Sequence, residues 1–393
     1  MTARHYDVIV VGLGAMGSAA LYQASVRGAN ALGIDRYEPP HTWGSSHGDT
    51  RITRAAIGEG ECYLPLVQRS DEIWRELESS GGTRLFHRSG GLIIAPSSSS
   101  ATFHGEGDFV EASARVAGQH GIAHEIIDAE EIKRRHSLLK PRANDRAYYE
   151  PGAGVLRPER CISTQLELAR RAGAIIHTGE KVTGYEASAD GVMVTSERGS
   201  YRADKLILSA GAWMADLVPQ AYRPGLRVCR QVIYWFAAED IRAFDPAVFP
   251  WVIWIGDTLE EFWSTFPAPS DGESGVKLVT EQYHTSTHPD EVSRAVTAEE
   301  RDDMYYRLTQ PRIDGLRAKL IRAEVCLYTV TPDEHFVIDF HPDSERVLIA
   351  SPCSGHGFKH SAAVGETLAQ LALDGKTEFD IAAFNLARLT ATL

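Results

Sequence analysis

The segment YDVIVVGLGAMGSAALYQASVRGANALGIDR, residues 6–36, decides the fold of this chain. Residues 7–11 are almost all apolar and largely β-branched, which is typical of a strand buried on both faces of a parallel sheet. A glycine-rich turn follows, and residues 19–24 then place apolar side chains at helical spacing. A second strand is expected at 31–34, directly before Asp35. The segment therefore predicts a strand, a glycine turn, a helix, a second strand and an acid, in that order.

The glycine turn has the spacing of a dinucleotide-binding site. Gly12, Gly14 and Gly17 form a GxGxxG pattern between the first strand and the helix. Such glycines permit a tight turn, and they let helix-terminal N–H groups come close to a pyrophosphate. An acid about twenty residues further on accepts from a ribose hydroxyl, and Asp35 stands in that place. Since the strand, helix and acid that this motif requires are all present in order, we predict a dinucleotide site.

The rest of the chain alternates between α/β segments and a region typical of antiparallel sheet. A helix is expected at 161–172 and a buried strand at 205–210, and a strand at 346–351 leads through a glycine turn into a C-terminal helix. Residues 226–284 are rich in aromatic side chains that can wall a pocket, and a helix is expected at 298–308. We therefore expect a mixed α/β fold, in which an antiparallel-sheet substrate domain is inserted into a Rossmann-like domain.

The length of 393 residues favours two domains, because a single core of ordinary size does not extend that far. The expected dinucleotide-binding domain is discontinuous and consists of residues 1–87, 151–220 and 325–393. The expected substrate domain consists of residues 88–150 and 221–324.

Composition excludes several classes of partner. The formal net charge of -13 argues against nucleic-acid binding, which needs a basic face, and favours a monomer that repels its own copies. No stretch stays apolar for the thickness of a bilayer, and the N-terminus lacks the apolar region of a signal peptide. We expect a cytoplasmic protein that binds neither nucleic acid nor membrane.

The cysteines fit neither a disulfide framework nor a zinc site, because they are odd in number and none has CxxC spacing. We expect no metal. The five are Cys62, Cys161, Cys229, Cys326 and Cys353. Cys326 lies in AEVCLYTVTPDEHF, residues 323–336, a run of strand-forming residues with no second cysteine. The usual role of such a cysteine is inert packing.

Five separated motifs together resemble one known family. They are YDVIVVGLGAMGSAA, PPHTWGSSHGDTRITR, EGECYLPLVQRS, EVCLYTVTPDEHFVID and SGHGFK. In order and spacing, along nearly the whole chain, they are similar to monomeric sarcosine oxidase and N-methyltryptophan oxidase, which are FAD-dependent amine oxidases of the D-amino-acid-oxidase type. Five motifs in register are far more specific than the glycine pattern alone.

The resemblance implies a covalent flavin. Cys326 occupies the place of the cysteine whose sulfur is attached to the 8α-methyl carbon of FAD, a role that requires surroundings favouring the thiolate. The other residues implied to hold FAD are Gly12, Gly14, Gly17, Asp35, Val182, Gly355, His356, Gly357, Phe358 and Lys359. Cys353, near the SGHGFK turn, is interpreted as packing.

The resemblance also implies roles for four basic residues. Arg54 and Lys359 would bind the substrate carboxylate, for which the guanidinium fork is well suited. Arg51 would lie against the flavin ring. Lys277 would promote the reaction with O2, because a fixed cation stabilises incipient superoxide. An acid four residues later, Glu281, could pair with Lys277 and weaken its field.

The expected substrate pocket departs from the family pattern. FWSTFP, residues 262–267, has Ser264 in a stretch where the family usually has a tyrosine pair. Glu281 stands where the family has a histidine that contacts the substrate. Both residues are therefore assigned to substrate binding, and they make the identity of the substrate an open question.

The expected reaction is oxidation by O2 of the secondary amine of an N-methyl amino acid, which gives the amino acid, formaldehyde and hydrogen peroxide. No side chain is required as a general base if the amine is bound unprotonated. One alternative is a cyclic or bulkier N-substituted amino acid, suggested by Ser264 and Glu281. Two others are a nicotinamide-dependent dehydrogenase, which has no use for Cys326, and a flavoprotein that only binds or senses, which needs no oxygen site.

Overall fold

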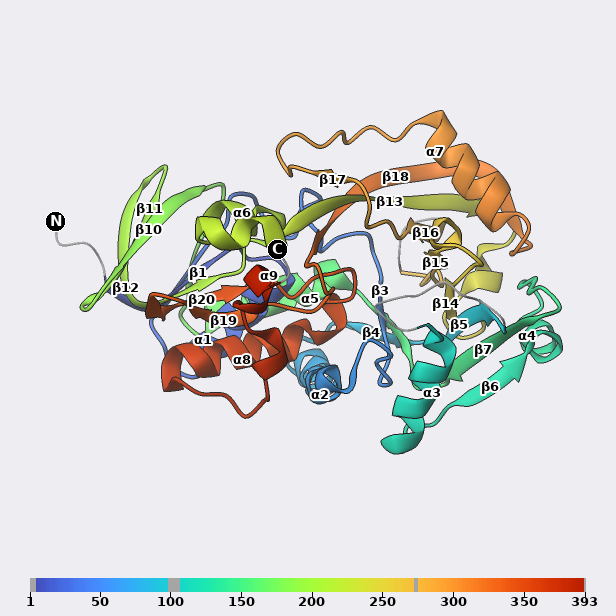
Figure 1. Cartoon of the computed structure of the whole chain (residues 1–393), viewed down its shortest axis with the longest axis horizontal. Helices are drawn as coiled ribbons and strands as arrows, with labels where there is room; N and C mark the ends of the chain where they lie inside the picture. Colours follow the sequence, from blue (N-terminus) through green and yellow to red (C-terminus); the bar gives the residue numbers. More distant parts are fainter. Residues whose placement is uncertain (1–4, 98–106, 272–274, 392–393) are drawn as a thin grey trace.

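The computed structural model describes residues 5–97, 107–271 and 275–391 of the chain. Two large sheets lie at opposite ends of an elongated molecule, and two long paired strands, β13 and β18, run along one side (Figure 1). None of the helices in these described ranges is long and apolar enough to cross a membrane.

The first sheet contains the predicted strand, turn, helix and strand. Parallel strands β12, β1, β2 and β9 lie side by side, β20 extends the parallel part from the end of β12, and β10, β11 and β19 pair antiparallel at the periphery. Its strands are β1 (His5–Val11), β2 (Ala31–Ile34), β9 (Ile175–His177), β10 (Val182–Ser188), β11 (Gly191–Ser196), β12 (Gly199–Leu208), β19 (Ile338–His341) and β20 (Ser344–Ala350). Strand β2 is buried along its whole length, as its unbroken apolar pattern predicts.

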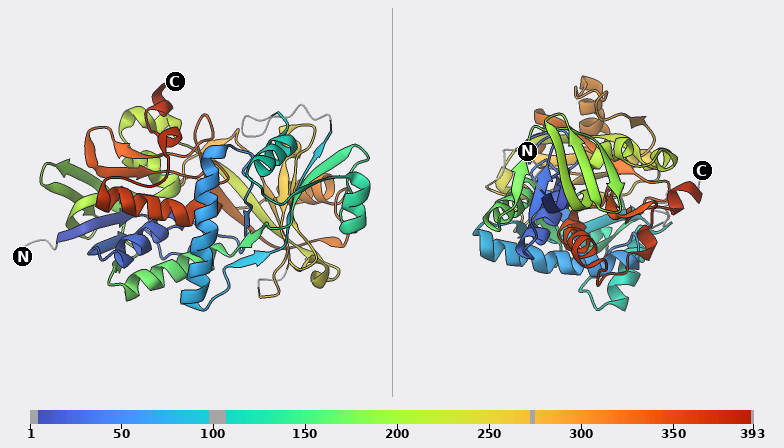
Figure 2. Two further views of the ribbon diagram at one scale, coloured as in Figure 1. Left: turned by 90° about the horizontal axis from the view of Figure 1, so that it is seen from below. Right: turned by 90° about the vertical axis from the view of Figure 1, so that its left-hand side faces the viewer.

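Four helices gather beside this sheet, as Figure 2 shows from below. They are α1 (Ala15–Val26), α2 (Leu64–Gly81), α5 (Pro158–Arg171) and α8 (Ser361–Asp374). Helix α1 packs on both α5 and α8. The contact with α8 is close because Gly365 faces Ala19, where an added Cβ would come within 2.3 Å of the Ala19 methyl group.

The second sheet follows the order β17, β13, β16, β15, β14, β5, β7 and β6. Strand β18 also pairs with β13, along nearly its whole length. All its pairs are antiparallel except β14 with β5. Its strands are β5 (Gly91–Pro96), β6 (Glu125–Asp128), β7 (Asp145–Glu150), β13 (Arg227–Ala238), β14 (Trp251–Trp254), β15 (Trp263–Thr265), β16 (Val276–Thr280), β17 (Ser286–Thr287) and β18 (Leu316–Val330).

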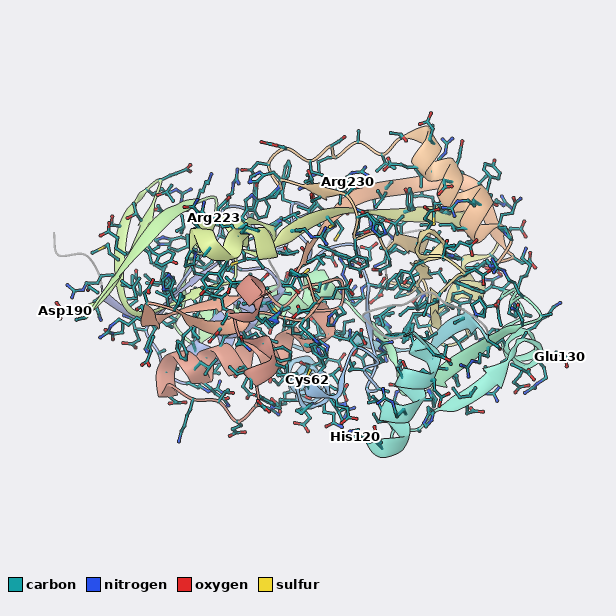
Figure 3. All side chains as sticks on the ribbon, in the orientation of Figure 1. Cys62, His120, Glu130, Asp190, Arg223 and Arg230 are labelled. Carbon is teal, nitrogen blue, oxygen red and sulfur yellow. The ribbon has the colours of Figure 1, made fainter. Side chains whose placement is uncertain are left out.

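A small third sheet joins β8 (Gly154–Leu156) to β3 (Arg51–Thr53) and β4 (Phe86–Arg88). The remaining helices are α3 (Phe109–Gln119), α4 (Ala129–Arg135), α6 (Met214–Leu217), α7 (Ala298–Asp302) and α9 (Arg388–Ala391). The helix expected at 298–308 is not one α-helix, because α7 ends at Asp302 and a π-helix continues from Asp303 to Thr309. Arg230 of β13, labelled in Figure 3, pairs with Glu300 and holds α7 beside the sheet.

The predicted fold class is confirmed: two differently built sheets share one chain that enters and leaves each of them several times. The exact domain segments stay a prediction. One expected boundary, between residues 324 and 325, falls inside β18, which continues unbroken to Val330 along β13.

Candidate functional site

A cavity with an empty volume of ≈ 2040 Å³ runs from the glycine turn after β1 to the aromatic wall of the second sheet. Its lining includes the loop before β3, the end of β15, the residues after β16, the middle of β18 and the loop after β20. Nearly all the residues assigned to a site from the sequence line this cavity, namely Gly12, Gly14, Asp35, Arg51, Arg54, Val182, Ser264, Glu281, Cys326, Gly355, His356, Gly357, Phe358 and Lys359. Gly17 and Lys277 lie behind the wall.

In the glycine turn, backbone atoms occupy the space that side chains at the glycine positions would need. Gly12 has a φ of +87°, and a Cβ there would lie 2.6 Å from the carbonyl oxygen of Ser209. A Cβ on Gly17 would lie 1.7 Å from the carbonyl oxygen of Gly12, so Gly17 lets α1 begin directly against the turn. The open N-terminus of α1 therefore faces the cavity, which suits a pyrophosphate.

Asp35 lies at the end of β2 and is 5% exposed. Its two carboxylate oxygens accept from the backbone N–H groups of Leu13 and Tyr37, each at 2.7 Å. These bonds fix the carboxylate in the cavity wall and leave a further lone pair on each oxygen for a ribose hydroxyl. The turn, the helix end and the acid thus fit the ADP half of FAD.

Cys326 is 1% exposed, and its thiol donates to the carbonyl of Ser45 at 3.6 Å. Burial alone would raise the pKa of Cys326, but the neighbouring His47 imidazole and the positive charge of Arg51 lower it below its ordinary value. The Arg51 guanidinium lies 3.7 Å from the sulfur. The surroundings therefore favour the thiolate, which is the form able to attack carbon.

His47 and Glu324 complete the surroundings of Cys326 and were not assigned a role from the sequence. The imidazole Nδ1 of His47 lies 2.9 Å from the Glu324 carboxylate. Burial lowers the pKa of His47, but its interactions with Cys326 and Glu324 prevail and raise it to about 9. His47 lies in the GSSHGDTR stretch of the sequence, but its contact with Glu324 forms only because β18 packs against this loop in the folded chain.

Arg54 and Lys359 meet in the cavity wall, as the substrate-binding hypothesis requires, and an acid lies between them. Glu59 accepts from Arg54 at 2.5 Å and from Lys359 at 3.4 Å. Burial lowers the pKa of Lys359 to about 8, although Glu59 acts in the opposite direction. The Nε and Nη1 atoms of Arg54 are buried and have no hydrogen-bond partner among the described residues, so the guanidinium retains donors for a further acceptor.

Lys277 of β16 is buried behind the wall and is 2% exposed. Its amino group donates to the carbonyls of Gly48, at 2.9 Å, and Thr50, and lies 3.8 Å from the ring centroid of Phe266. Burial and the nearby Arg51 charge lower its pKa well below the ordinary value. Within the described residues no ion pair joins Lys277 to Glu281, so the pairing considered from their spacing is not formed.

Glu281 follows β16 and projects into the cavity wall near Ser264, which is 2% exposed. Its carboxylate accepts from the hydroxyls of Tyr283, at 3.1 Å, and Tyr328, at 3.3 Å. Burial raises the pKa of Glu281 to about 8 despite these hydrogen bonds. Both tyrosines were missed from the sequence, because tyrosines are common and nothing in their spacing marks them.

The chain matches the model of the family described as "FAD dependent oxidoreductase" over residues 7–371. It is 39% identical over 387 residues to monomeric sarcosine oxidase of Bacillus sp. (strain B-0618), covering 98% of this chain and 96% of the relative. It is 34% identical over 388 residues to N-methyl-L-tryptophan oxidase of Yersinia pestis (strain Pestoides F), covering 98% and 99%.

Among solved structures, NikD, described as an unusual amino acid oxidase essential for nikkomycin biosynthesis, has a TM-score of 0.83 at 23% identity and covers 97% of both chains. Glycine oxidase from Geobacillus kaustophilus has a TM-score of 0.78 at 18% identity and covers 98% of this chain and 99% of that one. These two likenesses concern the fold. The family match over most of the chain, together with relatives above 30% identity along nearly its whole length, shows that this chain belongs to the FAD-dependent oxidoreductases, among the relatives of monomeric sarcosine oxidase.

Proposed function

We propose that this protein oxidises the secondary amine of an N-methyl amino acid with O2, giving the amino acid, formaldehyde and hydrogen peroxide. The observation that carries the proposal is one cavity lined both by two buried cations, Arg54 and Lys359, and by Cys326. Such an arrangement can hold a carboxylate while a flavin fixed at the thiol faces the neighbouring amine. The names of two relatives, a sarcosine oxidase and an N-methyl-L-tryptophan oxidase, support the same substrate class.

In this proposal the chain's own residues bind, orient and exclude water. When bound, FAD would supply the acceptor for the hydride of the carbon next to nitrogen, and O2 would take up the two electrons with two protons as hydrogen peroxide. Cys326 is the covalent attachment point, and Arg51 lies beside the flavin ring. Arg54 and Lys359 hold the substrate carboxylate, for which the Nε and Nη1 atoms of Arg54, unpartnered among the described residues, are available. Lys277 acts in the oxygen reaction.

The remaining assignments are part of the same proposal. The residues named above for the cofactor hold FAD, and the segments 1–87, 151–220 and 325–393 form its domain, while 88–150 and 221–324 form the substrate domain. The protein is a monomer of the cytoplasm that binds no nucleic acid. None of the five cysteines, all of which lie in the described residues, forms a disulfide, and this agrees with a reducing compartment.

A bulkier or cyclic N-substituted amino acid is the second candidate substrate. Ser264 gives a small, buried side chain to the cavity wall, and this leaves more room than a large aromatic residue there. The family membership of the chain favours flavin over the nicotinamide alternative.

The test is turnover of purified enzyme with a series of N-methyl and cyclic amino acids, in which oxygen uptake, hydrogen peroxide and formaldehyde are measured. One formaldehyde per peroxide with N-methyl substrates is expected. Peroxide without formaldehyde, from cyclic substrates alone, selects the second candidate. A purified protein that contains flavin but neither reduces it with any of these amines nor consumes oxygen refutes both.

A further inference from the structure

Glu281, which the sequence assigns to substrate binding, has no chemical role in the scheme above. It lines the same cavity as Arg54, Lys359 and Cys326. Its charge raises the pKa of Lys359, and the groups that act on Glu281 include Cys326 and Arg51. Glu281 is therefore within electrostatic reach of both the carboxylate-binding end and the thiol of the cavity.

The carboxylate of Glu281 has hydrogen-bond donors but no paired cation. Tyr283 and Tyr328 donate their hydroxyl protons to it, one to each oxygen. Within the described part of the chain no lysine, arginine or histidine forms an ion pair with it. A carboxylate has lone pairs for about two further donors, so this group can accept from a ligand. Buried carboxylates in proteins are usually paired, and a cationic ligand would supply the missing partner.

We infer that Glu281 binds the substrate's ammonium group and accepts its proton, while Arg54 and Lys359 hold the carboxylate of the same molecule. This inference rests on the proposed function and deepens it, because it makes the pocket selective for zwitterionic amino acids over simple carboxylates. It also replaces the expectation that the amine is bound unprotonated without help from a side chain.

The proton step balances without a further reactant. The N–H bond of the ammonium breaks, and an O–H bond forms on Glu281. Both electrons of the N–H bond stay on nitrogen as its lone pair, which the amine needs before the neighbouring carbon can be oxidised. Burial, which raises the pKa of Glu281 to about 8, makes its carboxylate a better proton acceptor than an exposed one.

The charged and titratable groups that act on Glu281 come from four elements. Tyr283 lies two residues along the same segment, Cys326 and Tyr328 belong to β18, Arg51 to β3, and Lys359 to the turn before α8. Lys359 has a pKa of about 8 as well, so a simple pH profile mixes the two groups. A ratio between two ligands with identical carboxylates removes the contribution of Lys359.

The experiment compares two ligands of the same shape on the flavin-loaded enzyme, with binding followed by the change in the visible flavin spectrum. N,N,N-trimethylglycine carries a permanent positive charge at nitrogen, and 3,3-dimethylbutanoate has an uncharged carbon in its place, while both carry the same carboxylate. As pH rises and Glu281 ionises, the trimethylammonium group gains a partner, whereas the tert-butyl group of 3,3-dimethylbutanoate gains none. The preference for trimethylglycine should therefore rise at least about tenfold between about pH 6 and about pH 9.

Three variants make this test specific. Glu281→Gln keeps the shape without the charge and should flatten the ratio, and Glu281→Met, which is also uncharged at every pH, should flatten it if the glutamine variant does not fold. Glu366→Gln removes a buried carboxylate outside the cavity, paired with Arg69, and should retain the rise. The inference is overturned if the ratio is flat in the natural enzyme, or if it rises in both Glu281 variants as much as in the natural enzyme.

A second measurement tests the proton step. Flavin reduction by N-methylglycine is followed without oxygen across the same pH range. In Glu281→Gln the rate should rise steadily with pH, about tenfold per unit, because only free amine reacts, while the natural enzyme should level off near the pKa of Glu281. If the natural enzyme and Glu281→Gln have identical pH profiles, proton transfer to Glu281 is refuted, and the oxidation of the amine itself is not. If the ligand ratio depends on Glu281 but no N-methyl amino acid reduces the flavin, the proposed function is refuted. The binding of zwitterions by Glu281 is then still supported.

Discussion

The carboxylate of Glu59 lies 2.5 Å from the guanidinium of Arg54, and both side chains are more than nine-tenths buried. The other oxygen of Glu59 lies 3.4 Å from the amino group of Lys359. One internal acid thus pairs with both of the cations that the proposed function assigns to the substrate. A buried pair of this kind is costly to break, so the substrate carboxylate has to use the donors of Arg54 that Glu59 leaves free.

Replacing Arg54 by methionine should weaken carboxylate ligands by at least about tenfold, because it removes charge-assisted hydrogen bonds and leaves Glu59 facing the ligand. Titration of the flavin spectrum with 3,3-dimethylbutanoate measures the dissociation constant. Arg242→Met is the matched control, because the Arg242 side chain is exposed to solvent, and this variant should bind 3,3-dimethylbutanoate normally. Unchanged affinity in a fully flavin-loaded Arg54 variant would remove Arg54 from the carboxylate site.

Cys326→Ser should lose its flavin on acid precipitation, whereas Cys353→Ser should keep yellow colour in the pellet. The reason is that Arg51 and His47 favour the thiolate only at Cys326, while burial raises the pKa of Cys353. His47→Asn should slow covalent attachment when apoprotein is mixed with FAD, because it removes the imidazole that helps to lower the pKa of the thiol. Colour that remains in the Cys326→Ser pellet would refute the tether.

Lys277→Met should slow the reaction of reduced enzyme with O2 far more than it slows reduction by substrate, because only the oxygen reaction gains from a fixed cation. Stopped-flow measurement separates the two half-reactions. Burial lowers the pKa of Lys277, so its positive charge is present at low pH and is lost as pH rises through a value well below 10.5. The oxygen reaction of the natural enzyme should slow with that titration, and the methionine variant should not show it. If both half-reactions slow equally, Lys277 belongs to substrate binding.

Glu150→Ala should lower the free energy of unfolding by about 2–4 kcal/mol, because it leaves buried donors without acceptors. The Glu150 carboxylate accepts from the backbone N–H groups of Ala55 and Ala56, at 2.6 and 3.1 Å, and from the hydroxyl of Tyr148 at 2.7 Å. It therefore fixes the loop that follows Arg54.

Urea unfolding of the flavin-loaded protein measures this loss. Glu130→Ala is the control, since the exposed side chain of Glu130, a residue of α4, lies at the outer end of the molecule (Figure 3), and its removal should change stability by no more than about 0.5 kcal/mol. An equal effect in the two variants would show that the bonds of Glu150 add nothing to stability.

Local patterns predicted the parts of the fold whose causes are local. The run before Gly12 became β1, and residues 31–34 became the fully buried β2. The helix at 298–308 was predicted only in part, since its second half is a π-helix. The π-helix packs Met304, Tyr305 and Leu308 into the core of the second sheet, so tertiary packing outweighed the ordinary helical register there.

The sequence by itself determined the glycine turn with its acid, the fold class and the resemblance that singles out Cys326, because each depends on residue types at short, fixed spacings. Only the tertiary structure decided which charges meet. Glu59 lies between Arg54 and Lys359, which are about 300 residues apart along the chain, and Glu281 faces a tyrosine from another strand. Burial then shifts the pKa of each group, and since burial depends on all the surrounding elements together, no local pattern encodes it.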